Sequence, residues 1–407
     1  MIIPLEKAST LRAVTKMVDK FSRPGRIAVL AALFVAIGVA IGPDRADAAA
    51  INAAFKGQSM WVWNMPQTED GNVAKIVARA KAAGVSAVYI KSADGSGAWK
   101  QLSRSLVNSL HAAGLRVCGW QFVYGAKPIG EARAAAATKA TGADCLIIDA
   151  ESSYEGRYSS ARTYMKELRR LVGAKYPLGF TSFPYVDYHP SLPYSVFLGP
   201  GGAEVNMPQV YWRDIGDSVT ASIKHTWREN RIYGRPIHPI GQTYQSPSAS
   251  EILSFRRLAA GYRAPGYSWW EWSTTSTKLW KALGQTLPAA TAAADPGWPL
   301  LRKGAKGDPV VRAQQLLASA GAAKLKATGV FDSATVAAVK AFQTSNGLTA
   351  DGQLGAATWV RLGKVTVALA RDRSKATAAQ SRQTSASSVV PRSSTLPPLK
   401  NELLGQR

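Results

Sequence analysis

The stretch Gly142-Ala143-Asp144-Cys145-Leu146-Ile147-Ile148-Asp149-Ala150-Glu151 is an apolar run that ends in two closely spaced acids. A short, continuous apolar run of this kind is typical of a strand buried in a parallel sheet. Side chains alternate across a strand, so Asp149 and Glu151 point to the same face, about 6.6 Å apart along the chain. The stretch therefore predicts a buried strand with a pair of carboxyl groups at its C-terminal end.

Seven more short apolar, aromatic-rich runs surround this one and alternate with longer Ala-, Arg- and Lys-rich stretches. The eight runs cover residues 60–65, 86–91, 116–124, 145–151, 178–183, 206–212, 237–244 and 267–273. Between them, 72–83 and 160–172 have the spacing of amphipathic helices. We expect an α/β fold, a (β/α)₈ barrel of TIM type, whose chemistry lies at the strand C-termini. The alternative is an open doubly wound sheet, but no glycine-rich phosphate loop follows the first run.

Composition divides the 407 residues into five segments, since one domain usually takes about 150 residues. The barrel is expected over 51–287. The Ala-rich stretch 288–299, bounded by prolines, predicts a linker. A small all-α domain is expected over 300–364, and the Ser-, Thr-, Gln- and Arg-rich segment 365–407 predicts a disordered basic tail.

The N-terminal segment 1–48 has the layout of a secretory signal peptide. Basic residues precede the apolar run 27–42, and Ala46-Asp47-Ala48 follows it with small residues. We expect export to the periplasm, the cell wall or the extracellular space. An uncleaved anchor is the alternative, and only that case predicts contact with a membrane.

The charge of the chain predicts anionic partners. Lys and Arg number 50 against 26 Asp and Glu, which gives a net charge of +24. Such a balance attracts anionic wall polymers and nucleic acid alike. The basic residues form no dense run or nucleic-acid motif, so no nucleic-acid partner is expected.

Two cysteines, Cys118 and Cys145, are expected to stay reduced. If Gln121 faces the barrel mouth, Cys118 lies on the opposite face of its strand, whereas Cys145 shares the parity of Asp149 and faces the lumen. A disulfide requires Cβ vectors that converge. These positions therefore predict two buried free thiols.

The segment 300–362 carries glycines, apolar residues and turn residues at regular spacing. They are Leu301, Gly304, Gly307, Val310, Gln314, Leu317, Gly329-Val330-Phe331, Phe342-Gln343, Gly347-Leu348, Asp351-Gly352, Gly355 and Thr358-Trp359. The segment resembles the small helical peptidoglycan-binding domain of many wall hydrolases, and this resemblance implies peptidoglycan as a partner. Folding accounts for most of the pattern, because Asp332 or Ser333 can cap a helix and Asp351-Gly352 can form a tight turn.

The acidic end of 142–151 resembles two glycosidase patterns. One is the Asp-x-Glu of family 25 lysozymes, and the other is the Asp-x-x-Asp-x-Asp-x-Glu of family 18 chitinases. Asp144, Asp149 and Glu151 match the first, third and last acids of the second pattern, but Ile147 replaces its middle acid. On the first strand, Asn64 ends Trp61-Val62-Trp63-Asn64, where family 25 lysozymes place an Asp.

These resemblances imply hydrolysis of an N-acetylated glycan in which the acetamido oxygen of the sugar attacks. Glu151 would act as the general acid, Asp149 would orient the acetamido group, and Tyr211 would donate a hydrogen bond to it. The expected substrate-binding residues are Asn64, Gln121, Gln209, Trp270 and Trp272. No cofactor is expected, and no metal, because the four histidines show no paired spacing.

Two functions from different classes remain open. The first is an exported peptidoglycan hydrolase, a lysozyme- or glucosaminidase-like glycoside hydrolase anchored by its C-terminal module. The alternative is a non-catalytic peptidoglycan-binding protein with a degenerate barrel, in which the two acids form salt bridges. Other polar residues near strand ends are expected to be solvated, namely Asp94, Asp187, His189, Asp214 and Glu271.

Overall fold

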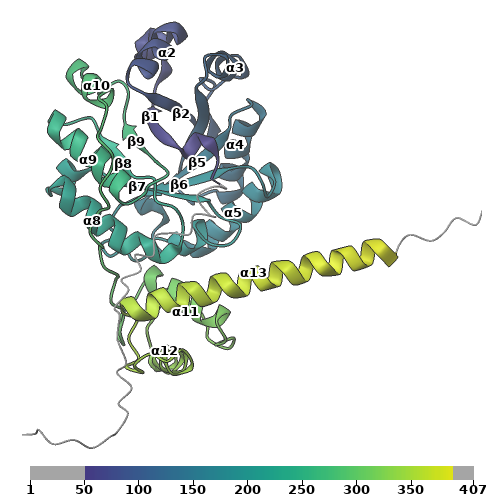
Figure 1. Ribbon diagram of the computed structural model, residues 1–407. Helices are drawn as coiled ribbons and strands as arrows, with labels where there is room; N and C mark the ends of the chain where they lie inside the picture. Colours follow the sequence, from purple (N-terminus) through teal and green to yellow (C-terminus); the bar gives the residue numbers. More distant parts are fainter. Residues whose placement is uncertain (1–50, 388–407) are drawn as a thin grey trace, which may run out of the picture. The chain divides into compact units, whose positions relative to one another are not determined.

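The computed structural model describes residues 51–387. Its strands are β1 (Gly57–Val62), β2 (Val85–Asp94), β3 (Gly97–Ala98), β4 (Arg116–Val123), β5 (Cys145–Ala150), β6 (Leu178–Ser182), β7 (Val205–Val210), β8 (Ile240–Gln242) and β9 (Gly266–Trp270). Eight of them pair in parallel in the order β1-β9-β8-β7-β6-β5-β4-β2, and β1 also pairs with β2, which closes the sheet (Figure 1). The short β3 pairs antiparallel with β2. The predicted (β/α)₈ barrel is confirmed, and each of the eight predicted runs overlaps one barrel strand.

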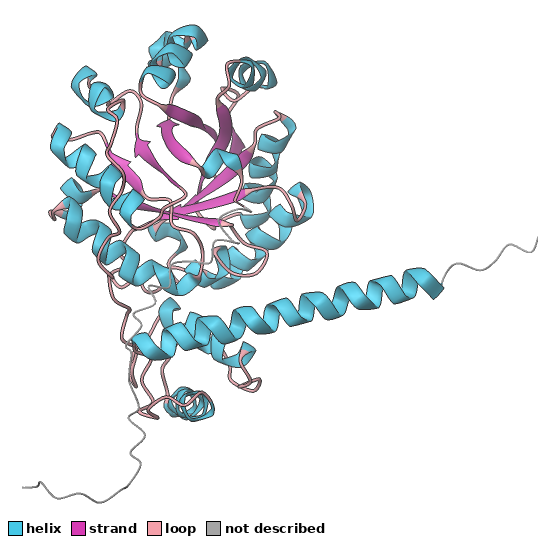
Figure 2. Ribbon diagram, viewed as in Figure 1, coloured by secondary structure: helices cyan, strands magenta, loops and turns pink. Residues whose placement is uncertain are grey.

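Helices surround the strands (Figure 2). The helices of the barrel are α2 (Val73–Ala82), α3 (Arg104–Ala112), α4 (Pro128–Ala140), α5 (Tyr158–Val172), α6 (Tyr194–Phe197), α7 (Trp212–Ile215), α8 (Val219–Asn230), α9 (Ala249–Gly261) and α10 (Thr277–Leu283). The side chains of Asn72, Ser103, Ser218 and Ser276 cap α2, α3, α8 and α10, and Ser248 forms a capping box with Glu251 at α9. These caps satisfy N–H groups that the helix itself leaves unpaired. The helices predicted over 72–83 and 160–172 are confirmed as α2 and α5.

The barrel lumen is filled by side chains from alternate positions of the strands. Buried aromatic and aliphatic residues form this cluster, among them Trp61, Tyr89, Trp120, Ile147 and Met207. The short 3₁₀ helix η1 (Ala53–Phe55) contributes Phe55 to the same cluster. The lumen is therefore a packed core, and the open space lies at one end of it.

The prediction of two free thiols is wrong, because Cys118 and Cys145 form a disulfide. They are opposite partners on the neighbouring strands β4 and β5, with 4.6 Å between their Cα atoms. The error lies in the assumed orientation of Gln121. Its side chain faces helices α4 and α5, where its amide donates to the Glu131 carbonyl and accepts from the Tyr164 hydroxyl. The opposite parity therefore directs Cys118 into the lumen beside Cys145.

We expect the intact protein to be two hydrogens lighter than the fully reduced chain, as measured by mass spectrometry without reductant. The bridge spans a sequence separation of 27 residues. Closing a loop of that size restricts the unfolded chain, so reduction should lower the free energy of unfolding by about 3 kcal/mol. Denaturant unfolding with and without a thiol reductant measures the difference. Equal stabilities would show that the bridge contributes nothing.

The C-terminal domain consists of α11 (Asp308–Ser319), α12 (Ser333–Ser345) and the start of α13 (Ala356–Ser387). Two buried glutamines hold it in matching ways. Gln314 on α11 accepts from the Gly329 N–H and donates to the Thr335 hydroxyl, while Gln343 on α12 accepts from the Gly352 N–H and donates to the Thr358 hydroxyl. Each glutamine thus ties a tight turn to the first turn of the next helix. Of the two predicted cap residues, Asp332 is the one that caps α12.

The last helix of the module extends into the segment for which a disordered tail is predicted. Helix α13 begins in the module and continues to Ser387, well into the segment 365–407 that was expected to be disordered. Ala, Arg, Lys and Gln are frequent here, and these residues favour helix although they bury little surface. Residues beyond 387 lie outside the described part of the chain.

The module contacts the barrel, so the predicted linker 288–299 does not leave it free. The Asp308 carboxylate, at the start of α11, accepts from the Ser195 N–H and hydroxyl and from the Tyr233 hydroxyl, at 2.6–2.8 Å. Arg312, one turn further, donates to the carbonyls of Ile232 and Tyr233. Burial raises the pKa of Asp308 to about 6, although these hydrogen bonds lower it. Two charged side chains of the module therefore bind polar groups of the barrel, and buried apolar residues of both parts belong to one cluster.

The signal peptide predicted over 1–48 lies outside the described residues. Within 51–387, none of the helices combines the length and the apolar character needed to cross a membrane.

Candidate active site

Strand β5 carries the candidate acids to the C-terminal mouth of the barrel. Asp149 lies near the end of the strand and is buried, whereas Glu151 follows the strand and is partly exposed. The 3₁₀ helix η4 (Ser152–Tyr154) starts directly after Glu151, so the extended chain ends at that residue. Both side chains line one cavity, as their predicted parity requires.

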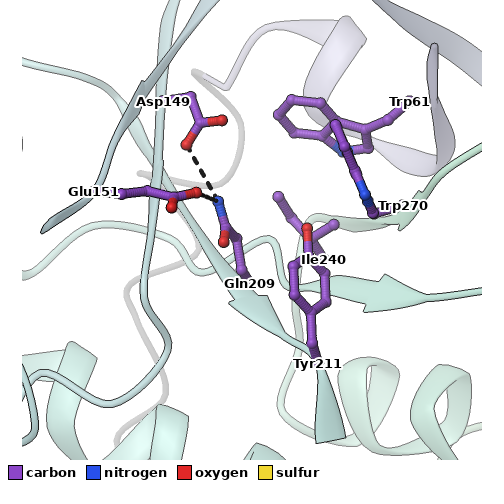
Figure 3. A pocket seen from close by; sticks show the side chains of 7 residues that line it. All are labelled: Trp61, Asp149, Glu151, Gln209, Tyr211, Ile240 and Trp270. Atoms are coloured by element: carbon purple, nitrogen blue, oxygen red, sulfur yellow. Dashed lines mark hydrogen bonds between the residues drawn. The ribbon is translucent and has the colours of Figure 1, made fainter. Parts of the chain in front are cut away.

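Gln209, near the end of β7, connects the two carboxyl groups. Its side-chain amide donates to Asp149 Oδ1 at 3.2 Å and to Glu151 Oε1 at 3.0 Å (Figure 3). One NH₂ group carries two protons and can satisfy two acceptors at once. Gln209 therefore fixes the relative position of the acids without adding a charge.

The electrostatics of the pair favour one bound proton. Burial, the charge of Glu151 and a hydrogen bond to it raise the pKa of Asp149 well above its ordinary value, while the Lys91 ammonium opposes this rise. Two neighbouring carboxylates cannot both ionise easily, so the pair keeps a proton at pH values where isolated acids have lost theirs. Burial also raises the pKa of Tyr211, which is therefore a neutral hydroxyl and a hydrogen-bond donor.

Apolar and aromatic side chains complete the cavity, which has a volume of about 150 Å³. Trp61, Ile240, Trp270 and Tyr211 line it together with the polar trio (Figure 3). Trp270 contacts Trp61 edge to face, with 5.8 Å between the ring centres, and its ring centre lies 6.4 Å from that of Trp63, a residue that is 50% exposed. Flat aromatic rings beside carboxyl groups offer a stacking surface for the apolar face of a sugar.

The structure brings five of the predicted site residues together. Asp149, Glu151, Gln209, Tyr211 and Trp270 all line the cavity. Their strands lie far apart in the sequence, so the barrel topology joins them.

Three predicted site residues lie outside the cavity lining. Gln121 faces the helices, as described above, because its strand has the opposite parity to the one assumed. Trp272 is buried on the outer side, where it packs on Trp280 and donates to Glu69. Asn64 precedes the 3₁₀ helix η2 (Met65–Gln67), so the chain has already turned away from the strand.

Asp144, the first acid of the chitinase-like pattern, lies before β5 and therefore at the end of the barrel opposite to the mouth. Its carboxylate accepts from the Val117 N–H and contacts His111 and Arg116. This acid holds strand and helix ends together, and it takes no part in the cavity.

The other polar residues near strand ends, which were expected to be solvated, also have hydrogen-bond partners. Asp187 binds His225, His189 binds Glu155, Asp214 binds the Tyr244 hydroxyl, and Asp94 binds Lys91. Glu271 is buried and accepts from Ser273 and the Thr274 N–H. Asp187 and Asp214 are exposed to solvent, as expected, and Asp94 and His189 are partly exposed, whereas Glu271 is buried, so the expectation is wrong for Glu271.

One group of possible metal ligands occurs among the described residues. Asp187, His225 and Glu229 bring ligand-type atoms within 4.8 Å of one another. His225 is hydrogen-bonded to Asp187, and Arg228 donates to Glu229 at 2.6 Å. These bonds already give each side chain a partner.

Fold and site together define a (β/α)₈ barrel with a linked acid pair at its mouth, joined to a small helical module. The module is confirmed by comparison, since residues 306–362 match the family described as "Putative peptidoglycan binding domain". Comparison with curated proteins gives no match.

Solved structures similar to the barrel include glycosidases of low identity. A chitinase from Chromobacterium violaceum is 10% identical, with a TM-score of 0.42 over 56% of this chain and 98% of its own. A GH18 chitinase from Cycas revoluta is 8% identical, with a TM-score of 0.43 over 56% and 98%. The spore cortex-lytic enzyme SleL from Bacillus megaterium is 9% identical, with a TM-score of 0.40 over 56% and 73%. Identities this low carry no information on activity.

Proposed function

We propose that the protein is an exported, wall-associated glycoside hydrolase that cleaves the N-acetylated glycan of peptidoglycan. One observation carries the proposal: Asp149 and Glu151, joined by Gln209, lie in an aromatic cavity of a chain that also has a peptidoglycan-binding-type module. Export rests on the pattern of residues 1–48. The disulfide supports it, because such bridges persist mainly in oxidising compartments.

The chemistry needs one proton and one internal nucleophile. The proton that the pair shares passes from Asp149 to Glu151, and Glu151 gives it to the glycosidic oxygen as the bond to the anomeric carbon breaks. The acetamido oxygen of the same sugar attacks that carbon. Asp149, as a carboxylate, stabilises the positive charge of the resulting oxazolinium ring, and the Tyr211 hydroxyl orients the acetamido oxygen. Water then adds to the anomeric carbon, and its proton returns to Glu151.

The size of the cavity agrees with a mechanism that acts on one sugar and its acetamido group. At about 150 Å³ it is smaller than the roughly 300 Å³ at which pockets for whole drug-sized ligands begin. It suits a single sugar with its acetamido group. The rest of a glycan chain would lie outside, where the exposed Trp63 ring is next to Trp270.

Incubation of the full chain with insoluble peptidoglycan tests the proposal. New reducing ends, identified by mass spectrometry, are the expected result. A chemically N-deacetylated glycan should resist cleavage, because it lacks the internal nucleophile. Release of reducing ends from both glycans at equal rates would contradict the acetamido-assisted mechanism.

A specific observation favours the second candidate, a non-catalytic wall-binding protein. The chain has Ile147 and Asn64 at two positions where the resembled glycosidase patterns have acids. If the full chain binds several wall types and releases no reducing ends from any, this function replaces the first.

We expect residues 298–364 alone to sediment with insoluble peptidoglycan at moderate salt. The fragment keeps both glutamine-centred networks and the buried Trp359, which donates to the Pro299 carbonyl. Its exposed interface would present Asp308 and Arg312, which are charged and tolerate water. Circular dichroism checks the fold, and a folded fragment that stays in the supernatant would contradict the prediction. In the full chain, such binding raises the local substrate concentration at the barrel.

A further inference from the structure

A cation is held inside the barrel mouth. The Lys91 side chain, near the end of β2, is 7% exposed, and its Nζ atom lies 2.6 Å from Asp94 Oδ2. The same ammonium lies over the rings of Trp63, Trp99 and Trp120, at 5.7, 4.6 and 4.9 Å from their centres. An ammonium group shielded from water is stable only with such partners. Its position is therefore fixed by four side chains.

The strand register brings this ion pair beside the acid pair. Lys91 is the partner of Trp120, which is the partner of Ile147, so these residues form one row across β2, β4 and β5. Asp94 and Asp149 share the next row toward the mouth, with Phe122 between them. The row one step deeper in the barrel than Asp149 thus contains both Lys91 and Ile147. Ile147 stands where the chitinase pattern has its middle acid.

Trp120 links the two groups physically. Its ring contacts Trp270 at 5.4 Å, and Trp270 lines the cavity with Asp149 and Glu151. Lys91 and Asp149 are both largely shielded from water, whereas Glu151 is partly exposed. Charges shielded from water act over longer distances than in solution.

We propose that Lys91, held by Asp94, is a positioning residue whose fixed positive charge determines how readily the Asp149–Glu151 pair gives up its shared proton. The inference rests on the proposed hydrolysis. When Glu151 transfers its proton to the leaving oxygen, both carboxyl groups are ionised, and a nearby ammonium stabilises that doubly negative state. Lys91 itself neither touches the substrate nor moves a proton.

The groups that act on Asp149 come from three strands. Glu151 follows β5, Gln209 and Tyr211 belong to the end of β7, and Lys91 and Asp94 lie on β2. Among these groups Lys91 is the cation, and Asp94 opposes it. The two members of the ion pair should therefore shift the titration in opposite directions.

The test compares Lys91→Met with Asp94→Asn in the full chain. Methionine keeps the length and the packing against the tryptophans but removes the charge, and asparagine still accepts from the Tyr124 hydroxyl, which now binds Asp94. The pH titration of the side-chain carboxyl carbons is followed by ¹³C NMR, with Asp149→Asn and Glu151→Gln used to assign the pair. Lys91→Met should raise the midpoint of the pair by about one pH unit, and Asp94→Asn should lower it.

Two controls separate charge from local damage. Lys91→Arg should titrate close to the parent protein, and Lys175→Met, at an exposed lysine before β6 at the other end of the barrel, should do the same. Midpoints that stay unchanged in Lys91→Met, or that move in the same direction in both variants, would overturn the inference. If Lys91→Met does not fold, Asp94→Asn still tests the inference, because the titration midpoint of the acid pair must fall in that variant.

Turnover provides a separate readout. If the protein hydrolyses peptidoglycan, the pH–rate profile of each variant should shift by the same amount and sign as its titration. If the protein proves inert, the proposed hydrolysis fails while the titration still decides the role of Lys91. If the enzyme is active but its variants keep the pH–rate profile of the parent, the inference about Lys91 is overturned while the proposed hydrolysis stands.

Discussion

Glu151→Gln is expected to lower the rate of glycan hydrolysis by about 10²- to 10⁴-fold, the usual contribution of a positioned acid. Glutamine has the shape of glutamate, and its carbonyl oxygen can still accept from the Gln209 amide, which lies 3.0 Å from Glu151 Oε1. The amide has no proton to give to the leaving oxygen. The fold and the cavity should therefore survive while the chemistry stops.

Reducing ends released from purified walls measure the rate, and sedimentation with the same walls measures binding. Glu155→Gln is a matched control, because Glu155 lies in the same loop but binds His189 and Ser191 outside the cavity. It should keep both activity and binding. A Glu151→Gln variant that degrades walls as fast as its parent would remove Glu151 from the mechanism, and another acid at the mouth would have to replace it.

The sequence predicts the barrel well because each strand leaves a local mark. All eight apolar runs became barrel strands, and α2 and α5 formed where the helical spacing indicated. The acid pair was predicted for the same reason, since Asp149 and Glu151 share a face by alternation alone. Closure of the barrel then brought Gln209, Tyr211 and Trp270 to them from distant strands.

The orientation of β4 was not predictable from its sequence. The run 116–123 is buried on both faces over most of its length, so hydrophobicity does not show which residues point to the lumen. The resemblance to glycosidases predicts Gln121 at the mouth, yet Tyr164 and two backbone carbonyls satisfy its side chain on the helix side. The same error separated Cys118 from Cys145. One wrong assignment of the lumen-facing residues of β4 therefore caused two wrong predictions, the free thiols and the site residue Gln121.

Lys91 illustrates a different limit. Its ion-pair partner Asp94 lies three residues further on, but nothing near it in the sequence indicates a role at the mouth, because Trp63, Trp120 and Asp149 come from other strands. Only the register between β2, β4 and β5 places the ammonium next to the acids. Alternation within a strand can be read from sequence, but the alignment of one strand against the next cannot.

Asp149→Asn should lower hydrolysis by about 10²- to 10³-fold, the range found when one preorganised electrostatic group is removed. Asparagine resembles the protonated form of Asp149, which burial and Glu151 favour at rest. It can still accept from Gln209 and donate to Glu151. It cannot become a carboxylate, so the charge that stabilises the oxazolinium ring is lost.

The same substitution should make the folded protein more stable at neutral pH. The pKa of Asp149 is raised in the folded state, so the folded state binds its proton more tightly than the unfolded chain does. The stabilising effect of that proton is complete below the unfolded pKa, near 4, and is lost as the pH rises through the folded pKa. An asparagine side chain is neutral at every pH and therefore avoids this loss, and a gain in stability at the expense of activity is common at such sites.

Thermal unfolding at pH 7 and at pH 4 measures this effect. The Tm of Asp149→Asn should exceed that of the parent at pH 7, and the gap should narrow toward pH 4, where Asp149 is protonated in both states. Glu155→Gln should not raise the Tm at pH 7. Hydrogen bonds from His189 and Ser191 lower the pKa of Glu155, so its ionised form stabilises the folded protein and the expected change in Tm has the opposite sign. A lower Tm at pH 7 for Asp149→Asn would mean that Asp149 is ionised in the resting protein and stabilises it, and the shared proton would then have to be placed on Glu151.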